Sequence, residues 1–510
     1  MIIKLILLVI FFGSMIAVGI VSRKHATNVN DFVLGGRSVG PWLTAFAYGT
    51  SYFSAVVFVG YAGQFGWKYG LASTWIGIGN ALIGCLLAWV VMGRRTRVMS
   101  QHLQAITMPD FFGKRYESKA LKIAASLIAF IFLIPYTASV YNGLSRLFGM
   151  AFDIPYTYCV IAMAALTGIY VIMGGYMATA INDFIQGIIM LAGIVCVIIA
   201  VLNGNGGFIE AVKNLAEVES DVIITMGQKG AFTSFFGADP WNLLGVIILT
   251  SLGTWGLPQM VHKFYTIKDE KSIKTGTIVS TAFAIIVSGG CYFLGGFGRL
   301  YSNKPGIVHG DGVLVAYDAI IPTMLSSLPD LLMGIVIVLV LSASMSTLSS
   351  LVLTSSSTIT LDLIKGNLIK KMNEKKQLIV LRIFIVCFIV ISVVIALDPP
   401  TFIAQLMGIS WGALAGSFLA PFLYGLYWKK VSKLAVWASF ICGVGITVSN
   451  MYLKYFASPI NAGAFAMIAG LIIVPIVSMI TPKFEKDKMD QIFVCFNEKV
   501  TVTERTSLPE

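Results

Sequence analysis

Hydroxyl side chains are concentrated in one apolar stretch of the chain. Between Ser342 and Thr360 there are twelve Ser and Thr residues in nineteen positions. On a helix, residues three and four apart share a face, so the hydroxyls would form two neighbouring stripes. One stripe holds Ser342, Ser346 and Ser349, and the other holds Ala343, Thr347, Ser350 and Thr354. Hydroxyl and carbonyl oxygens suit hard cations such as Na⁺. The alternative is that each hydroxyl bonds back to its own helix, which lets helices pack closely.

A carboxylate in another apolar stretch offers a second cation ligand. Asp183 lies within a predicted membrane span, where a charge is costly and normally faces a partner or a cavity. Without a Lys or Arg partner, a bound cation would compensate it. Ser349 and Ser350 follow Ser346 by three and four positions, so these hydroxyls can surround one point at the same depth. This pattern predicts a possible second Na⁺ site made of Asp183, Ser346, Ser349 and Ser350. The alternative is that Asp183 is a helix-end residue near the cytoplasm.

Signals for other chemistry are weak. Gly408 to Gly412 fits the GxSxG nucleophile motif, but that motif needs a strand-to-helix turn, whereas this segment lies in an apolar span. There is no GxxxxGK[ST] phosphate-binding loop, and the four His residues are isolated. We therefore expect no enzyme activity, no catalytic residues and no organic cofactor, with Na⁺ as the only bound metal ion.

The composition indicates a membrane protein with many spans. Of the 510 residues, 57% are hydrophobic and 12% are charged, about half the charge of a soluble globular protein. Thirteen spans are predicted from apolar stretches of sufficient length: 2–22, 43–64, 69–93, 120–148, 156–174, 179–202, 241–260, 272–300, 330–361, 377–397, 401–427, 433–455 and 460–481.

The distribution of Lys and Arg predicts the orientation. Alternate connections are rich in these residues, as in the segment from Arg94 to Lys119, and such connections face the cytoplasm. The intervening connections are poor in them, and the longest, 203–240, carries more acidic than basic residues. We therefore expect the amino terminus outside, the carboxyl terminus inside and a plasma-membrane location.

Two spans contain residues that weaken a helix. The second is interrupted near Gly49, and the seventh near Gly253, Gly256 and Pro258. Each interrupted span opens a group of five, and an odd number of spans gives the two groups opposite topology. Matched breaks in inverted halves are typical of the binding site of a secondary transporter.

The breaks supply the other half of the predicted cation site. Backbone carbonyls near Thr50 and Phe53 would face Ala343, Ser346 and Thr347 on the hydroxyl-rich helix. The predicted organisation is a first peripheral helix and loop (1–42), a first five-helix repeat (43–202), an extracellular loop (203–240), a second inverted repeat (241–428), two additional helices (429–481) and a cytoplasmic tail (482–510).

Four motifs resemble those of a known family, the sodium/solute symporters, in the branch of the proline and pantothenate symporters. The motifs are DFVLGGRSVG from Asp31, GGYMATAINDFIQG from Gly174, GLPQMVHKF from Gly256, and MSTLSS with SSSTITLDL from Met345. The resemblance runs from about Asp31 to Trp428. It implies an all-α membrane fold with a five-plus-five inverted-repeat core like that of the leucine transporter.

The resemblance also implies site residues. The shared Na⁺ site would use the backbone of Thr50, Phe53 and Ala343 and the hydroxyls of Ser346 and Thr347. The bacterial sialic acid transporter of this family has a second Na⁺ site that resembles the Asp183 set.

The resemblance implies a solute site as well, and Tyr136 matches a tyrosine of the proline symporter site. Tyr52 stands where that symporter has an aspartate and the pantothenate symporter a tyrosine, and Thr250 stands where the proline symporter has a tryptophan. Trp255, beside Pro258, would stack on the solute or pack as an ordinary aromatic. Arg37 lies in the LGGRS motif, which implies a structural or gating role.

The sequence therefore predicts a secondary active transporter that couples Na⁺ to a small organic solute by alternating access. The solute would be an amino acid such as proline, or a monocarboxylate or pantothenate-like anion. The alternatives are a transporter-like sensor and an uncoupled channel. The expected partners are the solute, Na⁺ and the bilayer, without nucleic acid and with a monomer as the functional unit.

Overall fold

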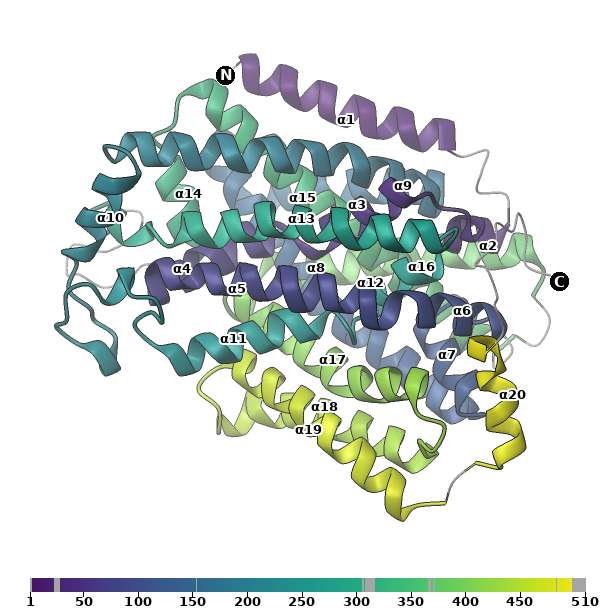
Figure 1. Cartoon of the computed structure of the whole chain (residues 1–510). Helices are drawn as coiled ribbons and strands as arrows, with labels where there is room; N and C mark the ends of the chain where they lie inside the picture. The colour runs from purple at the N-terminus through teal and green to yellow at the C-terminus, as the bar shows by residue number, and fades with distance from the viewer. Residues whose placement is uncertain are drawn as a thin grey trace.

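The structure is a computed structural model, and its described residues form helices joined by loops. These residues are 2–22, 28–152, 154–304, 307, 317–365, 368–369, 372–482 and 484–497, and they contain no β-strand. Most of the long helices run side by side along one direction (Figure 1). Eleven helices of the described chain are long and apolar enough to cross a membrane.

The first half of the chain contains an interrupted helix and two very long ones. Its elements are α1 (Ile2–Ser22), α2 (Val29–Leu34), α3 (Pro41–Tyr52), η3 (Val56–Tyr61), α4 (Ala62–Tyr69), α5 (Thr74–Gly79), η5 (Asn80–Leu87), η6 (Trp89–Gly93), α6 (Arg94–His102), α7 (Met108–Arg115), α8 (Lys119–Phe152), α9 (Tyr156–Gly204) and α10 (Phe208–Ala216). The π-helical turns η3, η5 and η6 continue into the α-helices beside them.

The second half begins with another interrupted helix. Its elements are α11 (Pro240–Gly253), α12 (Pro258–Tyr265), α13 (Glu270–Gly295), α14 (Ile320–Leu325), α15 (Asp330–Ser357), η11 (Thr358–Ile364), α16 (Glu374–Leu397), α17 (Ile403–Tyr427), α18 (Lys433–Leu453), α19 (Pro459–Ile480) and α20 (Lys486–Asn497). Helix α20 lies in the tail 482–510, for which the sequence predicts no helix.

Both predicted interruptions are present. After Tyr52, Phe53 has an extended backbone (φ −112°, ψ 100°), so α3 ends there. α11 ends at Gly253, and Leu257 is extended because it precedes Pro258, the first residue of α12. Each interruption therefore divides one span into two half-helices.

The two predicted spans 156–174 and 179–202 form one long helix, α9, which is sharply kinked between them. Gly175 has φ 56° and ψ −150°, a conformation that only glycine adopts at low cost. The helix therefore changes direction at this residue.

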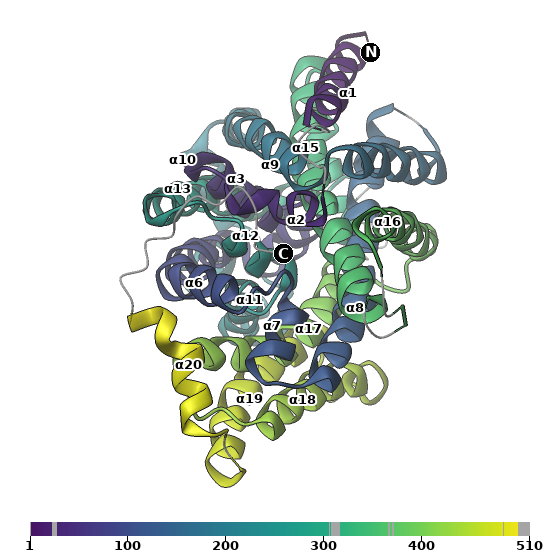
Figure 2. The same ribbon diagram turned by 90° about the vertical axis from the view of Figure 1, so that its right-hand side faces the viewer.

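Burial separates the central helices from the peripheral ones. In the most hydrophobic 18-residue stretch of α17, 94% is buried inside the protein. The corresponding share is 78% for the span formed by α15 and η11 and 22% for α1. The end view places α1 at one edge and α18 to α20 at the opposite edge, with α3, α12 and α15 between them (Figure 2). The hydroxyl-rich helix α15 therefore lies in the interior.

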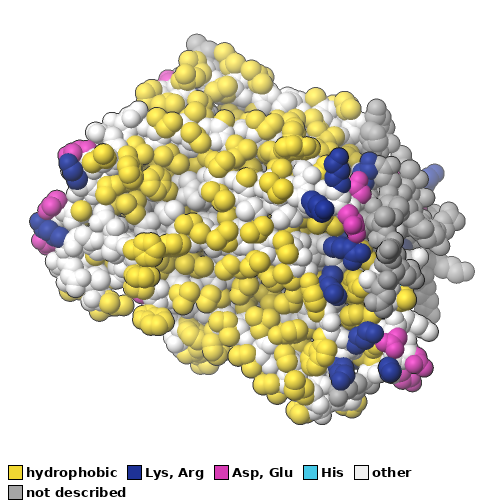
Figure 3. All heavy atoms as spheres, viewed as in Figure 1, with side chains coloured by type: hydrophobic (Ala, Val, Ile, Leu, Met, Phe, Trp, Pro, Cys, Tyr) yellow, Lys and Arg dark blue, Asp and Glu magenta, His cyan; other side chains and the backbone are white. Residues whose placement is uncertain are grey.

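Charged side chains gather at the two ends of the helices. The surface between the ends is largely hydrophobic, and Lys and Arg cluster at the end that carries α6, α7 and α20 (Figure 3; compare Figure 1). We call this end the basic end.

Candidate functional site

The first break lies against the hydroxyl-rich helix. Thr347 Oγ1 on α15 donates to the carbonyl oxygen of Ala343 at 3.1 Å and to that of Ser51 on α3 at 3.4 Å. Ser51 follows Thr50 and lies two residues before Phe53, where the helix is interrupted. The structure thus places the last turn of α3 beside the Ala343 to Thr347 turn of α15.

Besides Thr347 and Ser350, which contact other helices, two groups of hydroxyls can be distinguished on α15. Those that bond to carbonyls of α15 itself, as the packing alternative expects, are Ser344, Ser349, Ser356 and Ser357. Those that are buried and have no hydrogen-bond partner among the described residues are Ser342, Ser346 and Ser355. Buried polar groups are normally paired. Ser346, next to Thr347 and close to Asp183, makes no hydrogen bond of normal geometry to any described residue and can therefore accept a ligand.

Asp183 has a lysine partner. Lys263 Nζ on α12 lies 3.6 Å from Asp183 Oδ2 on α9 and 2.9 Å from Ser350 Oγ. Both charged side chains are almost fully buried. The argument for a second Na⁺ site assumed that Asp183 lacks such a partner, and this assumption is wrong. Whether Na⁺ binds to Asp183 together with Ser346, Ser349 and Ser350 remains a prediction.

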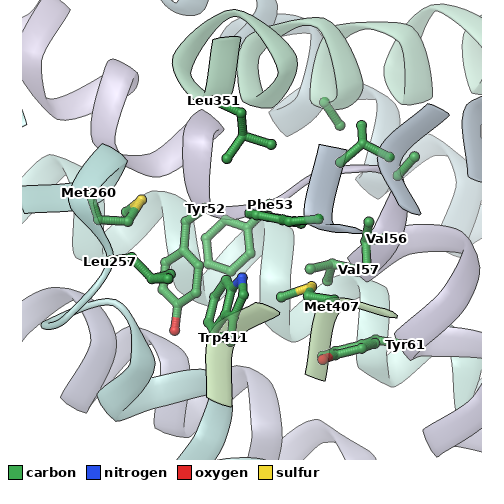
Figure 4. Close-up of a cluster of buried hydrophobic side chains, with 14 of the residues drawn as sticks. Tyr52, Phe53, Val56, Val57, Tyr61, Leu257, Met260, Leu351, Met407 and Trp411 are labelled. Carbon is green, nitrogen blue, oxygen red and sulfur yellow. The ribbon is translucent and has the colours of Figure 1, made fainter. Parts of the chain in front are cut away.

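Aromatic rings fill the region beside the first break (Figure 4). The ring of Tyr52 stacks on Phe53 with centroids 4.3 Å apart and lies 6.1 Å from Trp411 on α17. Trp411 also meets Tyr136 edge to face at 5.9 Å, and the Tyr52 hydroxyl donates to the Thr250 carbonyl oxygen at 2.5 Å. Three predicted solute-site residues, Tyr52, Tyr136 and Thr250, are therefore connected, two of them through Trp411.

The second break positions the other two predicted solute residues. Trp255 Nε1 donates to the carbonyl oxygen of Ile83 on η5 at 3.0 Å. Pro258 starts α12, whose next residues include Met260 in the central apolar cluster of Figure 4. The indole N–H of Trp255 is therefore already used in holding the break against η5.

Arg37 joins segments that are distant in the sequence. Its guanidinium donates to Ser100 Oγ at 3.0 Å, to the Tyr265 carbonyl oxygen at 3.1 Å and to the Ala105 carbonyl oxygen at 2.6 Å. The side chain is buried. It thus ties the end of α12 to the segment after α6, an arrangement that suits the structural role expected for it.

The glycines near the breaks allow close packing. A Cβ at Gly49 would lie 2.6 Å from the Phe283 ring, and one at Gly253 would lie 2.7 Å from the Trp411 ring. A Cβ at Gly256 would lie 2.8 Å from backbone atoms of α17. A side chain at Gly49 would push the first break away from α13. A side chain at Gly253 or Gly256 would push the second break away from α17.

A network of ion pairs connects α7, α8 and η11 at the basic end. Lys122 on α8 bridges Asp110 at 2.7 Å and Asp362 at 3.2 Å, and Thr107 Oγ1 donates to Asp362 at 2.5 Å. Although burial alone would raise it, Lys122 and Lys114 hold the pKa of Asp110 below its usual value. Asp110 is therefore a buried, paired carboxylate, although its place in a charged connection between spans is typical of a solvated residue.

Comparison with known proteins identifies similar sequences over most of the chain. The family model of the sodium:solute symporter family matches residues 32–443. The osmoregulated proline transporter OpuE of Bacillus subtilis is 30% identical over 484 residues, covering 93% of this chain and 94% of that protein. Sodium/proline symporter 2 of Staphylococcus saprophyticus is 31% identical over 494 residues, covering 94% and 93%.

Solved structures show the same fold. A Na⁺-coupled sialic acid symporter, solved in a substrate-bound outward-open state, has a TM-score of 0.77 at 17% identity and covers 95% of this chain and 98% of that one. MhsT in complex with L-phenylalanine has a TM-score of 0.53 at 14% identity, covering 87% and 98%. The all-α membrane fold with a leucine-transporter-like core is therefore confirmed, while the count of thirteen spans stays a prediction.

Proposed function

Because the chain belongs to the sodium:solute symporter family, we propose that it uses the Na⁺ gradient to accumulate proline or a solute of similar size. Family membership makes it a multi-pass plasma-membrane transporter, coupled to Na⁺, and not an enzyme. The proposal concerns the solute and the residues that bind it. Two relatives of similar length at 30–31% identity are proline transporters, which supports proline over the monocarboxylate and pantothenate-like candidates.

We propose that Na⁺ binds where the first break meets α15. The observation that carries this proposal is the contact between Thr347 Oγ1 and the Ser51 carbonyl oxygen, beside the unpaired hydroxyl of Ser346. The carbonyls of Thr50, Phe53 and Ala343 would complete a ligand set made only of oxygens, as hard cations require. A cation here would hold α3 against α15, so its release would free the two helices to separate.

The solute would bind beside the rings of Tyr52, Tyr136 and Trp411. Trp411 Nε1 is buried beside the Tyr136 hydroxyl and makes no hydrogen bond of normal geometry among the described residues, so it can donate to a carboxylate. The amino end of the half-helix α12, beginning at Pro258, also favours negative charge. A small zwitterion with an apolar body, such as proline, fits these features. The functional unit would be the monomer.

Uptake by the purified chain in proteoliposomes tests the function. An inward Na⁺ gradient should drive accumulation of labelled proline, and an inside-negative potential should accelerate it because a neutral zwitterion enters with a cation. Replacing Na⁺ by choline, with proton coupling excluded, should abolish accumulation, and undiminished uptake would contradict the proposal. Na⁺-driven uptake of pantothenate or a monocarboxylate, but not of proline, would identify that compound as the solute. An Na⁺ current without solute would indicate a channel.

A further inference from the structure

A buried lysine side chain lies within the cluster of oxygens around Asp183. Lys263 Nζ is 2.9 Å from Ser350 Oγ and 3.6 Å from Asp183 Oδ2. Ser350 Oγ in turn lies 2.8 Å from Ser51 Oγ. These groups come from the four elements α12, α15, α9 and α3, so the ammonium lies where the half-helices meet α9 and α15.

The environment of this ammonium resembles that of a bound cation. An ammonium is a compact point charge that needs oxygen neighbours, as a monovalent metal ion does. A hydroxyl oxygen and a carboxylate oxygen lie beside it. The ring of Tyr176, whose centroid is 5.2 Å away, can attract a cation through its π-face. The charge of Asp183 is therefore compensated inside the protein.

A second cation at this position would meet an unfavourable field. Lys263 and Asp183 form a pair without net charge, and both side chains are at most 2% exposed. A Na⁺ beside the same carboxylate would add a positive charge close to the ammonium without water to screen it. Ser350 already contacts the ammonium, so one of the hydroxyls that Na⁺ would need is engaged.

We propose that Lys263 is a resident cation that takes the place of a second Na⁺, so that the protein binds and moves one Na⁺ per solute. This inference rests on the proposed function, because it presupposes Na⁺ binding between α3 and α15. The resident charge also adjoins that site, since Ser51 contacts Ser350 through its hydroxyl and Thr347 through its carbonyl oxygen. Lys263 would therefore block the second site, and it is linked to the first through Ser350 and Ser51.

Counting bound Na⁺ tests this without knowledge of the solute. Equilibrium binding of ²²Na⁺ to the full chain in detergent should give one ion per molecule for the unmodified protein. Lys263→Met leaves Asp183 uncompensated, so it should bind a second ion. Lys263→Met combined with Asp183→Asn should return the count to one, and Lys263→Arg should keep it at one because the guanidinium retains the charge. The matched control is Lys271→Met, an exposed lysine of α13, which should also give one.

The outcomes separate the two proposals. Two ions bound to the unmodified protein, or a count of one with unchanged affinity for Lys263→Met, would overturn the resident cation. No bound Na⁺ in the unmodified protein would instead contradict the Na⁺ site of the proposed function. If Lys263→Met fails to fold, the unmodified protein in proteoliposomes still tests the resident cation through the ratio of ²²Na⁺ to labelled proline taken up. A ratio of one is expected, and a ratio of two would contradict the proposal.

Discussion

Thr347 bonds across to α3 and Ser346 makes no hydrogen bond to α15, whereas hydroxyls such as that of Ser344 bond to α15 itself. We therefore expect Ser346→Ala and Thr347→Ala each to raise the Na⁺ concentration that gives half-maximal uptake. Loss of one contact to a charged group costs about 1.5–3 kcal/mol, which corresponds to roughly a tenfold to hundredfold weaker affinity. Uptake measured against Na⁺ concentration at saturating proline gives this value.

Ser344→Ala is the matched control for these two variants. Ser344 lies on the same helix and is equally buried, but its hydroxyl bonds to the Val340 carbonyl oxygen of its own helix. Its removal should leave the Na⁺ dependence unchanged. If all three variants behave alike, the hydroxyls serve packing and the proposed Na⁺ site is wrong.

We propose that Trp411 offers a hydrogen-bond donor and Tyr136 an aromatic ring to the solute. Trp411→Phe retains an aromatic ring but loses the indole N–H, so the half-saturating proline concentration should rise about tenfold, as expected for one hydrogen bond to a charged group. Tyr136→Phe should have a smaller effect because the ring contact remains. Uptake against proline concentration, at fixed Na⁺, measures both.

A tryptophan outside the aromatic cluster provides the comparison. Trp437 on α18 is half-buried and packs against Phe440, so Trp437→Phe should not change proline affinity. Equal affinities for Trp411→Phe and the unmodified protein would mean that the solute binds elsewhere.

The burial of individual α15 hydroxyls could be predicted from the sequence because one helix determines that geometry, whereas their role in binding Na⁺ remains a proposal. The spacing along α15 put Ser346 and Thr347 on an inward face, and the structure brings that face to α3. The pairing of Asp183 with Lys263 joins residues eighty positions apart on helices that meet only in the fold, so spacing could not reveal it. Trp411 could not be found from spacing either, since its proposed role rests on contacts with Tyr52 and Tyr136 on other helices.

At the scale of elements, most predicted spans end within a few residues of the observed helices. The span 433–455 corresponds to Lys433–Leu453 and the span 460–481 to Pro459–Ile480, because apolar length and turn residues mark such ends. The π-helical turns of η3 and η5 were not predicted. They have no sequence signature that distinguishes them from ordinary helix, and tertiary packing selects them. The repeat boundaries 43–202 and 241–428 remain proposals.

The kink of α9 at Gly175 yields a prediction about stability. Its backbone conformation costs other residues about 1–3 kcal/mol, and a Cβ there would lie 2.8 Å from the Phe32 carbonyl oxygen. Gly175→Ala should therefore lower the apparent melting temperature of the detergent-purified protein. Gly445→Ala, on α18 where a Cβ meets nothing within 4 Å, should not lower it. Equal melting temperatures for the two variants would show that the kink relaxes without cost.

At the scale of the whole molecule, the number of Na⁺ ions sets the attainable gradient. At a membrane potential of about 100 mV, one charge gains about 2.3 kcal/mol, and a tenfold Na⁺ gradient adds about 1.4 kcal/mol. One Na⁺ therefore supports a solute ratio of roughly 500, and two would square it. If Lys263 is a resident cation, the protein accumulates its solute only to the lower limit.

The distribution of charge along the molecule predicts its orientation in the membrane. The basic end carries α6 with Arg94, α7 with Lys114, and Lys429, which pairs with Asp490 of α20 (Figure 1). The opposite end carries α10 of the 203–240 connection, which has an excess of acidic residues. Because Lys and Arg are retained in the cytoplasm during insertion, the basic end and the carboxyl terminus should face inward. Lys430→Cys, exposed at the basic end, should then react with a membrane-impermeant maleimide only after the cells are permeabilised.

The opposite end should behave in the reverse way. Lys229→Cys replaces a side chain that is 57% exposed and pairs with Glu217 in the 203–240 connection, so it should react in intact cells. The unmodified protein measures the background from its seven native cysteines. Labelling of Lys430→Cys but not of Lys229→Cys in intact cells would invert the topology.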